Sequence, residues 1–220
     1  MNKLRTIQSI VDHGIVAVLR AKDADEVAEM AEQAIAGGIK AIEITMTVPS
    51  ALRAIEKLAA KYSSKATDES KFAIIGVGTV LDPETARAAI LSGAEFVVGP
   101  ALNPATVALC NRYRVPVMPG VMTIKEIQEA LELGVDIVKL FPSTTPAMIK
   151  AIKGPLPQAN VMPTGGVTLD NVGEWISAGA VAVGIGSDLT AEATKKGDLN
   201  LVAKRAAQYA EAFKRAKAIG

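Results

Sequence analysis

The segment FAIIGVGTVLDPETARAAILSGAEFVVGP (residues 72–100) contains the unit from which the fold can be predicted. It begins and ends with apolar runs that are rich in β-branched residues and lack polar alternation, as is typical of strands covered on both faces. Between these runs, Asp82 and Pro83 form a helix N-cap followed by a proline at the first helical position. Gly93 then stands where a left-handed residue ends a helix. The segment predicts a strand, a helix and a second strand parallel to the first.

The same unit recurs along the chain, because eight apolar runs alternate with helix-like segments at roughly 20 to 30 residues per unit. The runs are IVAVLR from Ile15, AIEIT from Ala41, FAIIGVGT from Phe72, FVVGP from Phe96, PVMPGV from Pro116, IVKLFP from Ile137, VMPTGG from Val161 and AVGIGS from Ala182. This alternation predicts an α/β fold, a (β/α)8 TIM barrel preceded by an extra helix near residues 2–12. A doubly wound open sheet is the alternative, but GVGTV does not match its G-x-G-x-x-G fingerprint. The length fits a single domain over residues 1–220.

The charge and cysteine content restrict the classes of partner. The chain has 24 basic and 23 acidic residues, a balance that gives no reason to expect nucleic acid or an anionic membrane as a partner. A single cysteine, Cys110, excludes an intrachain disulfide and fits a reducing compartment. The N-terminal segment MNKLRTIQSIVDHG lacks the apolar core of a signal peptide, and no apolar run is long enough to span a membrane. We therefore expect a cytoplasmic protein.

A metal site is not indicated by the residue types present. With one histidine, His13, and one cysteine, a zinc site of the usual composition is not expected. A magnesium site made of carboxylates alone stays open as an alternative, although the sequence shows no convergent cluster of aspartate and glutamate.

Lys139 stands in the middle of the sixth apolar run, where a charged residue is costly to bury. Four runs can be aligned on the glycines that end the preceding helices, and the positions five residues after Gly38, Gly93, Gly134 and Gly179 are Glu43, Val98, Lys139 and Gly184. Side chains from alternate strands of a barrel meet in one interior layer. The register therefore predicts that Glu43 and Lys139 face each other in the barrel mouth, with Gly184 leaving room for a ligand.

This pair suggests covalent catalysis. A neutral lysine amine can attack a carbonyl carbon and form a Schiff base, which draws electrons from an adjacent C–C bond. A neighbouring glutamate can move protons during formation and breakdown of the adduct. The alternative is a buried ion pair that only fixes closure of the barrel, since such pairs are weak evidence for stability.

Two further groups of residues stand at predicted strand ends. Gly165 and Gly166 follow the seventh strand, and Gly186 and Ser187 follow the eighth, where many barrels bind phosphate through backbone N–H groups and a helix N-terminus. Plain turns are the alternative. Arg20 ends the first strand and Thr79 the third, so Arg20 could hold a carboxylate or tune the Glu43–Lys139 pair, and Thr79 could donate to a carboxylate.

Eight motifs together resemble a known family. The motifs are IVAVLR, IEIT followed by TVPSAL, IIGVGTVL, GAEFVVGP, MPGVMT, VKLFP, MPTGGV and VGIGSDL, and they extend from about residue 15 to residue 189. In this order and spacing the chain resembles the 2-keto-3-deoxy-6-phosphogluconate (KDPG) aldolase family, which also includes 4-hydroxy-2-oxoglutarate (KHG) aldolases. The resemblance implies a class I aldolase on a trimeric (β/α)8 barrel that uses no metal and no organic cofactor.

The resemblance also implies roles for individual residues. Lys139 would form the Schiff base and Glu43 would be the general acid and base, while Arg20 and Thr79 would border the end of the substrate that becomes pyruvate. Further residues matching binding positions are Pro100 and Phe141 around the Schiff base, Thr164 beside the hydroxylated carbons, and Gly165, Gly166, Gly186 and Ser187 in the phosphate loops.

One position departs from the family pattern. Thr47 stands where many members carry an arginine that binds the substrate carboxylate, so Arg20 and Thr79 would have to hold that group here. Thr164 resembles the residue of enzymes acting on the gluconate-derived substrate rather than on its galactonate epimer.

The activity that the resemblance implies is reversible retro-aldol cleavage of 2-dehydro-3-deoxy-6-phosphogluconate to pyruvate and glyceraldehyde 3-phosphate by a homotrimer. The expected partners are thus small molecules, a phosphorylated 2-oxo sugar acid and pyruvate. Cleavage of 4-hydroxy-2-oxoglutarate to pyruvate and glyoxylate, alone or as a second activity, is an alternative. A non-catalytic trimeric assembly block on the same barrel is an alternative from another class.

Overall fold

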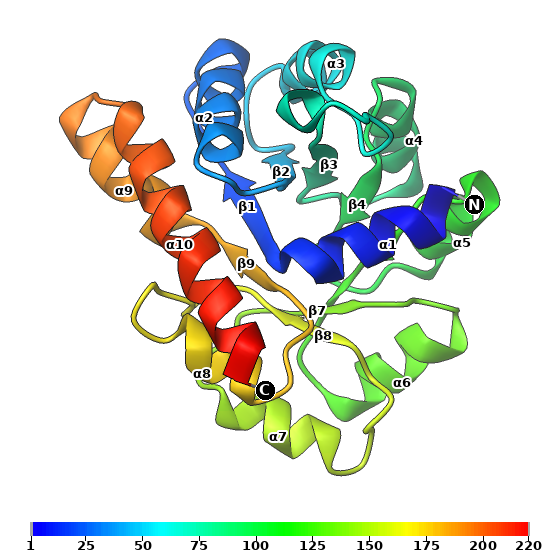
Figure 1. Cartoon of the computed structure of the whole chain (residues 1–220). Coiled ribbons are helices and arrows are strands. Elements are labelled where there is room, and N and C mark those ends of the chain that lie inside the picture. The colour runs from blue at the N-terminus through cyan, green and yellow to red at the C-terminus, as the bar shows by residue number, and fades with distance from the viewer. Residues whose placement is uncertain (1, 220) are drawn as a thin grey trace.

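The computed structural model describes residues 2–219 and has an α/β fold with a curled parallel sheet (Figure 1). The strands are β1 (Ile15–Leu19), β2 (Ala41–Thr45), β3 (Ile74–Gly78), β4 (Phe96–Val98), β5 (Val117–Met118), β6 (Gly120–Val121), β7 (Val138–Leu140), β8 (Val161–Pro163) and β9 (Val183–Ile185). The helices are α1 (Asn2–His13), α2 (Ala24–Ala36), α3 (Ala51–Lys61), the short 3-10 helix η1 (Glu69–Lys71), α4 (Pro83–Leu91), α5 (Pro104–Tyr113), α6 (Ile124–Glu132), α7 (Ala147–Lys153), α8 (Val172–Ser177), α9 (Ser187–Lys196) and α10 (Asn200–Ile219).

Every predicted run contains a strand, but the fifth run contains two. β5 and β6 lie on either side of Pro119, which has no N–H to donate to a ladder. The strands form a six-stranded sheet in the order β5-β4-β3-β2-β1-β9 and a three-stranded sheet in the order β6-β7-β8. A parallel bridge between Thr164 and Gly184 joins the segment after β8 to β9.

The helix boundaries follow the predicted cap residues. Asp82 accepts a hydrogen bond from the N–H of Thr85 at 2.6 Å and begins α4, with Pro83 at its first position. Gly93 follows α4 with φ of 102°, a left-handed conformation that favours glycine. The predicted N-terminal helix is confirmed as α1.

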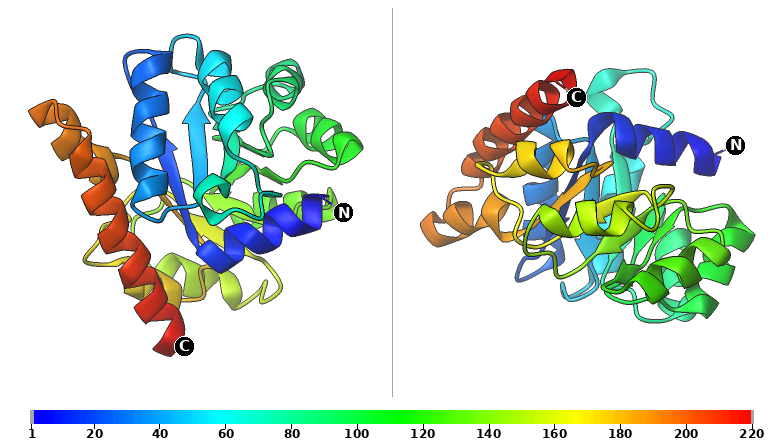
Figure 2. Two further views of the ribbon diagram at one scale, coloured as in Figure 1. Left: turned by 45° about the horizontal axis from the view of Figure 1, so that its top comes forward. Right: turned by 90° about the horizontal axis from the view of Figure 1, so that it is seen from below.

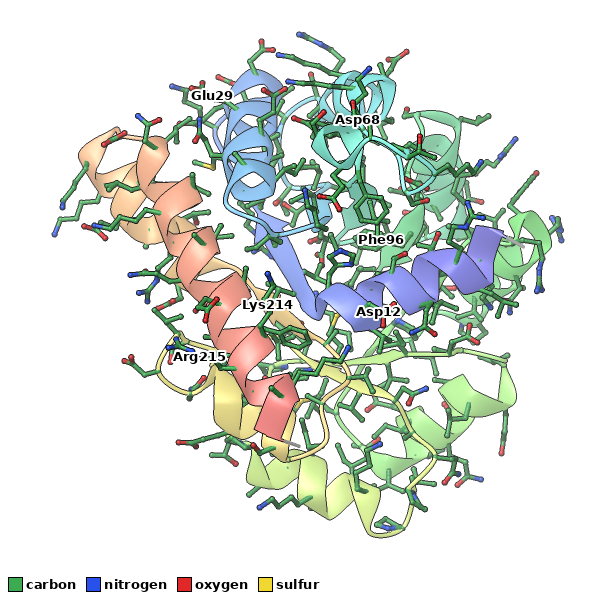
Figure 3. The ribbon with its side chains drawn as sticks, in the orientation of Figure 1. Asp12, Glu29, Asp68, Phe96, Lys214 and Arg215 are labelled. Carbon is green, nitrogen blue, oxygen red and sulfur yellow. The ribbon has the colours of Figure 1, made fainter. Side chains whose placement is uncertain are left out.

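Two hydrophobic cores follow from the alternation of side chains along each strand. The outer core lies between the strands and the surrounding helices. The inner core consists of buried residues that the strands point inward, together with Ile10 of α1: Ile10, Val16, Ala41, Ile74, Phe96, Val98, Met118, Ile137, Met162 and Ala182. α1 closes this inner core through Ile10, and Figure 3 labels Phe96 beside this helix. The helix therefore covers one end of the strands and leaves the opposite, C-terminal end for the site.

The C-terminal helix α10 packs outside the strands against α2, α8 and α9 (Figure 2). None of the helices within residues 2–219 combines the length and the apolar character that crossing a membrane requires.

Candidate active site

Lys139 and Glu43 meet on the inner side of the curled sheet. Lys139 lies on β7 and Glu43 on β2, and the Lys139 Nζ is 3.7 Å from the Glu43 Oε1. The two side chains are 6% and 0% exposed. This geometry confirms the predicted register, in which the two residues face each other. A lysine so deeply buried is unusual, and its contact with one carboxylate explains how the charge is tolerated.

Burial raises the pKa of the Glu43 carboxyl, because a carboxylate is poorly stabilised away from water. The positive charges of Lys139 and Arg20 oppose this effect. Within the described chain, neither carboxylate oxygen has a hydrogen-bond partner at normal distance. Glu43 is thus a carboxyl group that holds a proton more readily than an exposed glutamate, as a group that accepts and returns protons requires.

Gly78, at the end of β3, makes the space for the Glu43 carboxylate. A Cβ at position 78 would lie 1.9 Å from the Glu43 Oε1 and 2.5 Å from its Cδ, so any larger residue would displace the carboxylate. Sequence reasoning did not identify this residue as part of the site. The available signal was a glycine inside an apolar strand, which often marks a close approach.

Gly184 does not leave room for a ligand as predicted. A Cβ at position 184 would lie 2.3 Å from the Oγ1 of Thr164, so the glycine accommodates the threonine side chain. Thr164 is buried, and its Oγ1 has no hydrogen-bond partner among the described residues. A buried hydroxyl without a partner is costly unless a bound molecule satisfies it, which makes Thr164 a candidate contact for a substrate hydroxyl.

Arg20 and Thr79 follow β1 and β3 at the same end of the strands. The Arg20 guanidinium is close enough to Glu43 to lower its pKa, and it lies 3.9 Å from where a Cβ at Gly186 would be. Thr79 has φ of 58°, a left-handed conformation that is rare for a β-branched residue. Such strain persists where the surrounding structure enforces it, and it is common at functional sites.

Thr47 has a hydroxyl that contacts another protein hydroxyl. The Thr45 Oγ1 donates to the carbonyl oxygen of Leu19 at 3.2 Å and lies 2.8 Å from the Thr47 Oγ1. Either threonine can be the donor in this contact, and because the side chain of Thr47 is exposed, its hydroxyl is accessible to a substrate.

Phe141 borders the lysine, and Pro100 contacts the neighbouring strand β6. The Lys139 Nζ lies 5.1 Å from the centroid of the Phe141 ring. Pro100 packs closely on Gly120, the residue paired with Lys139 in the β6–β7 ladder: a Cβ at position 120 would lie 2.0 Å from the Pro100 carbonyl oxygen. The Phe141 ring thus gives one side of the amine an aromatic wall.

The two glycine loops lie side by side. Gly165 and Gly166 have φ values of 83° and 68°, and the bridge between Thr164 and Gly184 places their loop beside the segment that enters α9. α9 begins at Ser187, directly after Gly186. The structure thus brings together the two segments that were predicted to form an anion site.

Sequence reasoning missed a polar cluster behind this site. The carboxylate of Asp188, in the first turn of α9, lies 2.7 Å from the Nη2 of Arg205 and accepts a hydrogen bond from the Tyr209 hydroxyl. Arg205 and Tyr209 belong to α10, so the cluster ties α10 to the start of α9. Burial, with the neighbouring Asp188, raises the pKa of Tyr209. Nothing in the sequence pattern indicated which partners these side chains would find.

A second large concave surface, on the part of the chain that the structure describes, is lined by polar and charged side chains. A groove of about 930 Å³ lies between α2 and the connection from α9 to α10, away from the strand ends, and acidic side chains such as Asp23, Asp25 and Glu26 line it. Among residues 2–219, no three histidine, cysteine, aspartate or glutamate side chains converge as metal ligands would. The buried Lys139–Glu43 pair therefore marks the candidate active site.

Known proteins resemble this chain over most of its length. The sequence profile of KDPG and KHG aldolases matches residues 7–205. A 2-dehydro-3-deoxy-phosphogluconate aldolase of Treponema pallidum is 34% identical over 74% of this chain and 75% of that protein. A 2-dehydro-3-deoxy-6-phosphogalactonate aldolase of Escherichia coli K12 is 33% identical over 92% of this chain and 95% of that protein.

Solved structures also resemble this chain over most of its length. A native KDPGal structure has a TM-score of 0.83 at 32% identity, covering 93% of this chain and 96% of that chain. A KDPG aldolase of Legionella pneumophila, with pyruvate captured at low pH as a covalent carbinolamine intermediate, has a TM-score of 0.76 at 29% identity, covering 88% and 92%. A cube-shaped cage designed by fusing symmetric oligomeric domains has a TM-score of 0.83 at 32% identity, covering 94% and 74%.

Proposed function

The chain belongs to the KDPG and KHG aldolase family, and we propose that it cleaves 2-dehydro-3-deoxy-6-phosphogluconate to pyruvate and glyceraldehyde 3-phosphate. It is a lyase of the class I type. The observation that carries this proposal is the buried contact of 3.7 Å between the Lys139 Nζ and the Glu43 Oε1. The covalent carbinolamine of pyruvate in the Legionella relative supports the same chemistry.

The first half of the reaction forms an imine. The Lys139 amine attacks C2 of the substrate, and the resulting carbinolamine loses its hydroxyl as water when Glu43 supplies a proton. Since burial raises the pKa of Glu43, its protonated form is available nearer neutral pH than that of an exposed glutamate. The product is a protonated imine that withdraws electrons from C3.

The second half breaks the carbon chain. The C4 hydroxyl gives its proton to the Glu43 carboxylate, the electrons of the C3–C4 bond move toward the iminium nitrogen, and glyceraldehyde 3-phosphate leaves as the aldehyde. Glu43 then returns the proton to C3 of the enamine. Water hydrolyses the pyruvate imine and restores the free Lys139 amine.

The remaining site residues would orient the substrate. We assign the carboxylate to Arg20 and Thr79, which follow β1 and β3 at the C-terminal end of the strands. Thr164 would satisfy its buried hydroxyl with a substrate hydroxyl at the C4–C5 end. Pro100 and Phe141 would enclose the imine, and Gly165, Gly166, Gly186 and Ser187 would bind the phosphate.

The proposal includes closure of the strands into a (β/α)8 barrel within a single domain over residues 1–220. Two observations support closure: the bridge between Thr164 and Gly184 connects the edges of the two sheets, and only Pro119 separates β5 from β6 at the other edges. A closed ring places the C-terminal ends of all strands around one mouth, which is where barrel enzymes carry their sites.

We also propose a homotrimer, active in the cytoplasm. Exposed apolar side chains on and beside α4 and α5 support association, notably Leu81 at 64% and Leu91 at 70% exposure. The cage relative, built by fusing symmetric oligomeric domains, supports symmetric assembly. The presence of a single cysteine, Cys110, supports a reducing compartment. Burial raises the pKa of its thiol to about 12.

Pyruvate release tests the proposed reaction. We expect faster release from 2-dehydro-3-deoxy-6-phosphogluconate than from its galactonate epimer or from 4-hydroxy-2-oxoglutarate. If pyruvate is released from 4-hydroxy-2-oxoglutarate alone, the chain has the KHG aldolase activity, the second one that the family's description names. Release of pyruvate from none of the three would refute the proposed function and favour an assembly block, which the solution mass would then report as a trimer or a larger particle.

A further inference from the structure

In the loop after β8, the conformational preferences of the residues themselves do not fix how the peptide groups are oriented. Gly165 and Gly166 both have positive φ, and glycine adopts positive and negative φ with similar ease. In a planar trans peptide the N–H points opposite to the C=O. Whatever holds the two glycine carbonyls therefore decides where the next two N–H groups point.

Ser143, in the loop after β7, holds the first carbonyl. Its hydroxyl is buried and lies 2.6 Å from the carbonyl oxygen of Gly165, the nearer of its two acceptors, with the carbonyl oxygen of Thr164 at 3.0 Å. Its backbone N–H donates to the Thr164 carbonyl oxygen at 3.0 Å, which fixes the two loops relative to each other. The N–H of Gly166 belongs to the same peptide as the Gly165 carbonyl, so it points away from Ser143.

Asn171, directly before α8, holds the second carbonyl. Its Nδ2 donates to the Gly166 carbonyl oxygen at 2.9 Å. Its Oδ1 accepts from the Thr168 N–H at 2.8 Å and from the Nε1 of the fully buried Trp175 at 3.1 Å. Because two donors fix the Oδ1, the amide cannot turn over without losing both bonds. The N–H of Val167 then points away from Asn171.

The freed N–H groups have no acceptor inside the protein. Within the part of the chain that the structure describes, no hydrogen bond is made by the N–H of Gly166 or Val167. The bridge between Thr164 and Gly184 sets this loop beside the start of α9, where the N–H groups of Ser187 and Asp188 are also without intrahelical partners. The two sets of donors adjoin, as an oxyanion with several oxygens requires.

We propose that Ser143, Asn171 and Trp175 are positioning residues that aim the Gly166 and Val167 N–H groups at the phosphate of the substrate. The assignment of the phosphate rests on the proposed function. Without these side chains each glycine peptide is free to rotate, and rotation replaces an N–H donor by a carbonyl oxygen that repels the anion. The carbonyl anchors thus convert a flexible glycine pair into a preorganised anion site.

The test uses Asn171→Ala and Ser143→Ala, with Ser177→Ala as the matched control because Ser177 is exposed on α8. Binding of inorganic phosphate is followed through the backbone amide NMR signals of Gly166 and Val167. In the native protein both signals should shift, and the dissociation constant should rise about tenfold or more in each anchor variant, the effect of losing a hydrogen bond to a charged group. Ser177→Ala should match the native protein.

The second readout is the preference for phosphorylated substrate. kcat/KM for the phosphorylated sugar acid should fall at least about tenfold further than kcat/KM for the same acid without phosphate. An equal loss for both substrates, or phosphate binding by Asn171→Ala as tight as in the native protein, overturns the inference, as does the absence of phosphate-dependent shifts at Gly166 and Val167. Shifts that depend on Asn171, in a protein that cleaves no phosphorylated sugar acid, would support the inference and reject the proposed function.

Discussion

Replacing Gly78 by alanine should disable the site by moving one carboxylate. The added Cβ would lie 1.9 Å from the Glu43 Oε1, whereas ordinary contact begins at 3.4 Å. The carboxylate must therefore move by about 1.5 Å, and since a misplacement of about 1 Å can cost 100-fold in rate, we expect kcat/KM to fall about 100-fold or more. The crowding should also lower the free energy of unfolding by about 1–3 kcal/mol.

The assay is pyruvate release coupled to lactate dehydrogenase, with urea unfolding measured on the same samples. Gly37→Ala is the matched control: its Cβ would lie 2.3 Å from the Ala203 carbonyl oxygen, between α2 and α10 and away from Glu43. It should lose at least as much stability, because the clash is with backbone, but keep the kcat of the native protein while folded. Gly78→Ala with kcat/KM within threefold of the native value would refute the assignment of Glu43.

Three further substitutions extend the account. In the native protein, kcat should fall on the acidic side at a pH above 4.5, because burial raises the pKa of Glu43 and the carboxylate needed as base is lost as the pH falls through that pKa. Glu43→Gln should remove this acidic limb from the plot of kcat against pH. If kcat of the variant depends on pH as in the native protein, a group other than Glu43 causes the acidic limb. Thr164→Val should lower kcat/KM by about fivefold, roughly 1 kcal/mol, more for the gluconate-derived acid than for its epimer; equal effects on both would remove Thr164 from epimer selection. Tyr209→Phe should lower the free energy of unfolding by about 1–2 kcal/mol through loss of its bond to Asp188, and urea titration showing no change would contradict that contribution.

Much of the fold was predictable because its signals are local. Each strand is a short apolar run, and caps such as Asp82 with Pro83 and glycines such as Gly93 fix the ends of the helices between them. Counting from these glycines also placed Glu43 opposite Lys139, because the pleat makes inward positions periodic. The register of parallel strands can thus be predicted from the sequence where the connections from helix to strand are alike.

Other parts of the site depend on packing between distant elements. The division of the fifth run at Pro119 reflects a missing N–H, which a pattern of apolar residues does not register. That Gly78 makes room for Glu43, and Gly184 for Thr164, follows from the separation of neighbouring strands. The bonds of Asp188 to Arg205 and Tyr209 depend on how α10 docks on α9, which no local pattern encodes.

Trapping of the imine tests the central claim most directly. Native protein incubated with pyruvate and sodium borohydride, then digested and analysed by mass spectrometry, should carry the reduced pyruvyl adduct on the peptide containing Lys139, with loss of activity in proportion. Lys139→Met should form no adduct. Inactivation without an adduct, or an adduct on a different lysine with Lys139 unmodified, would contradict the account.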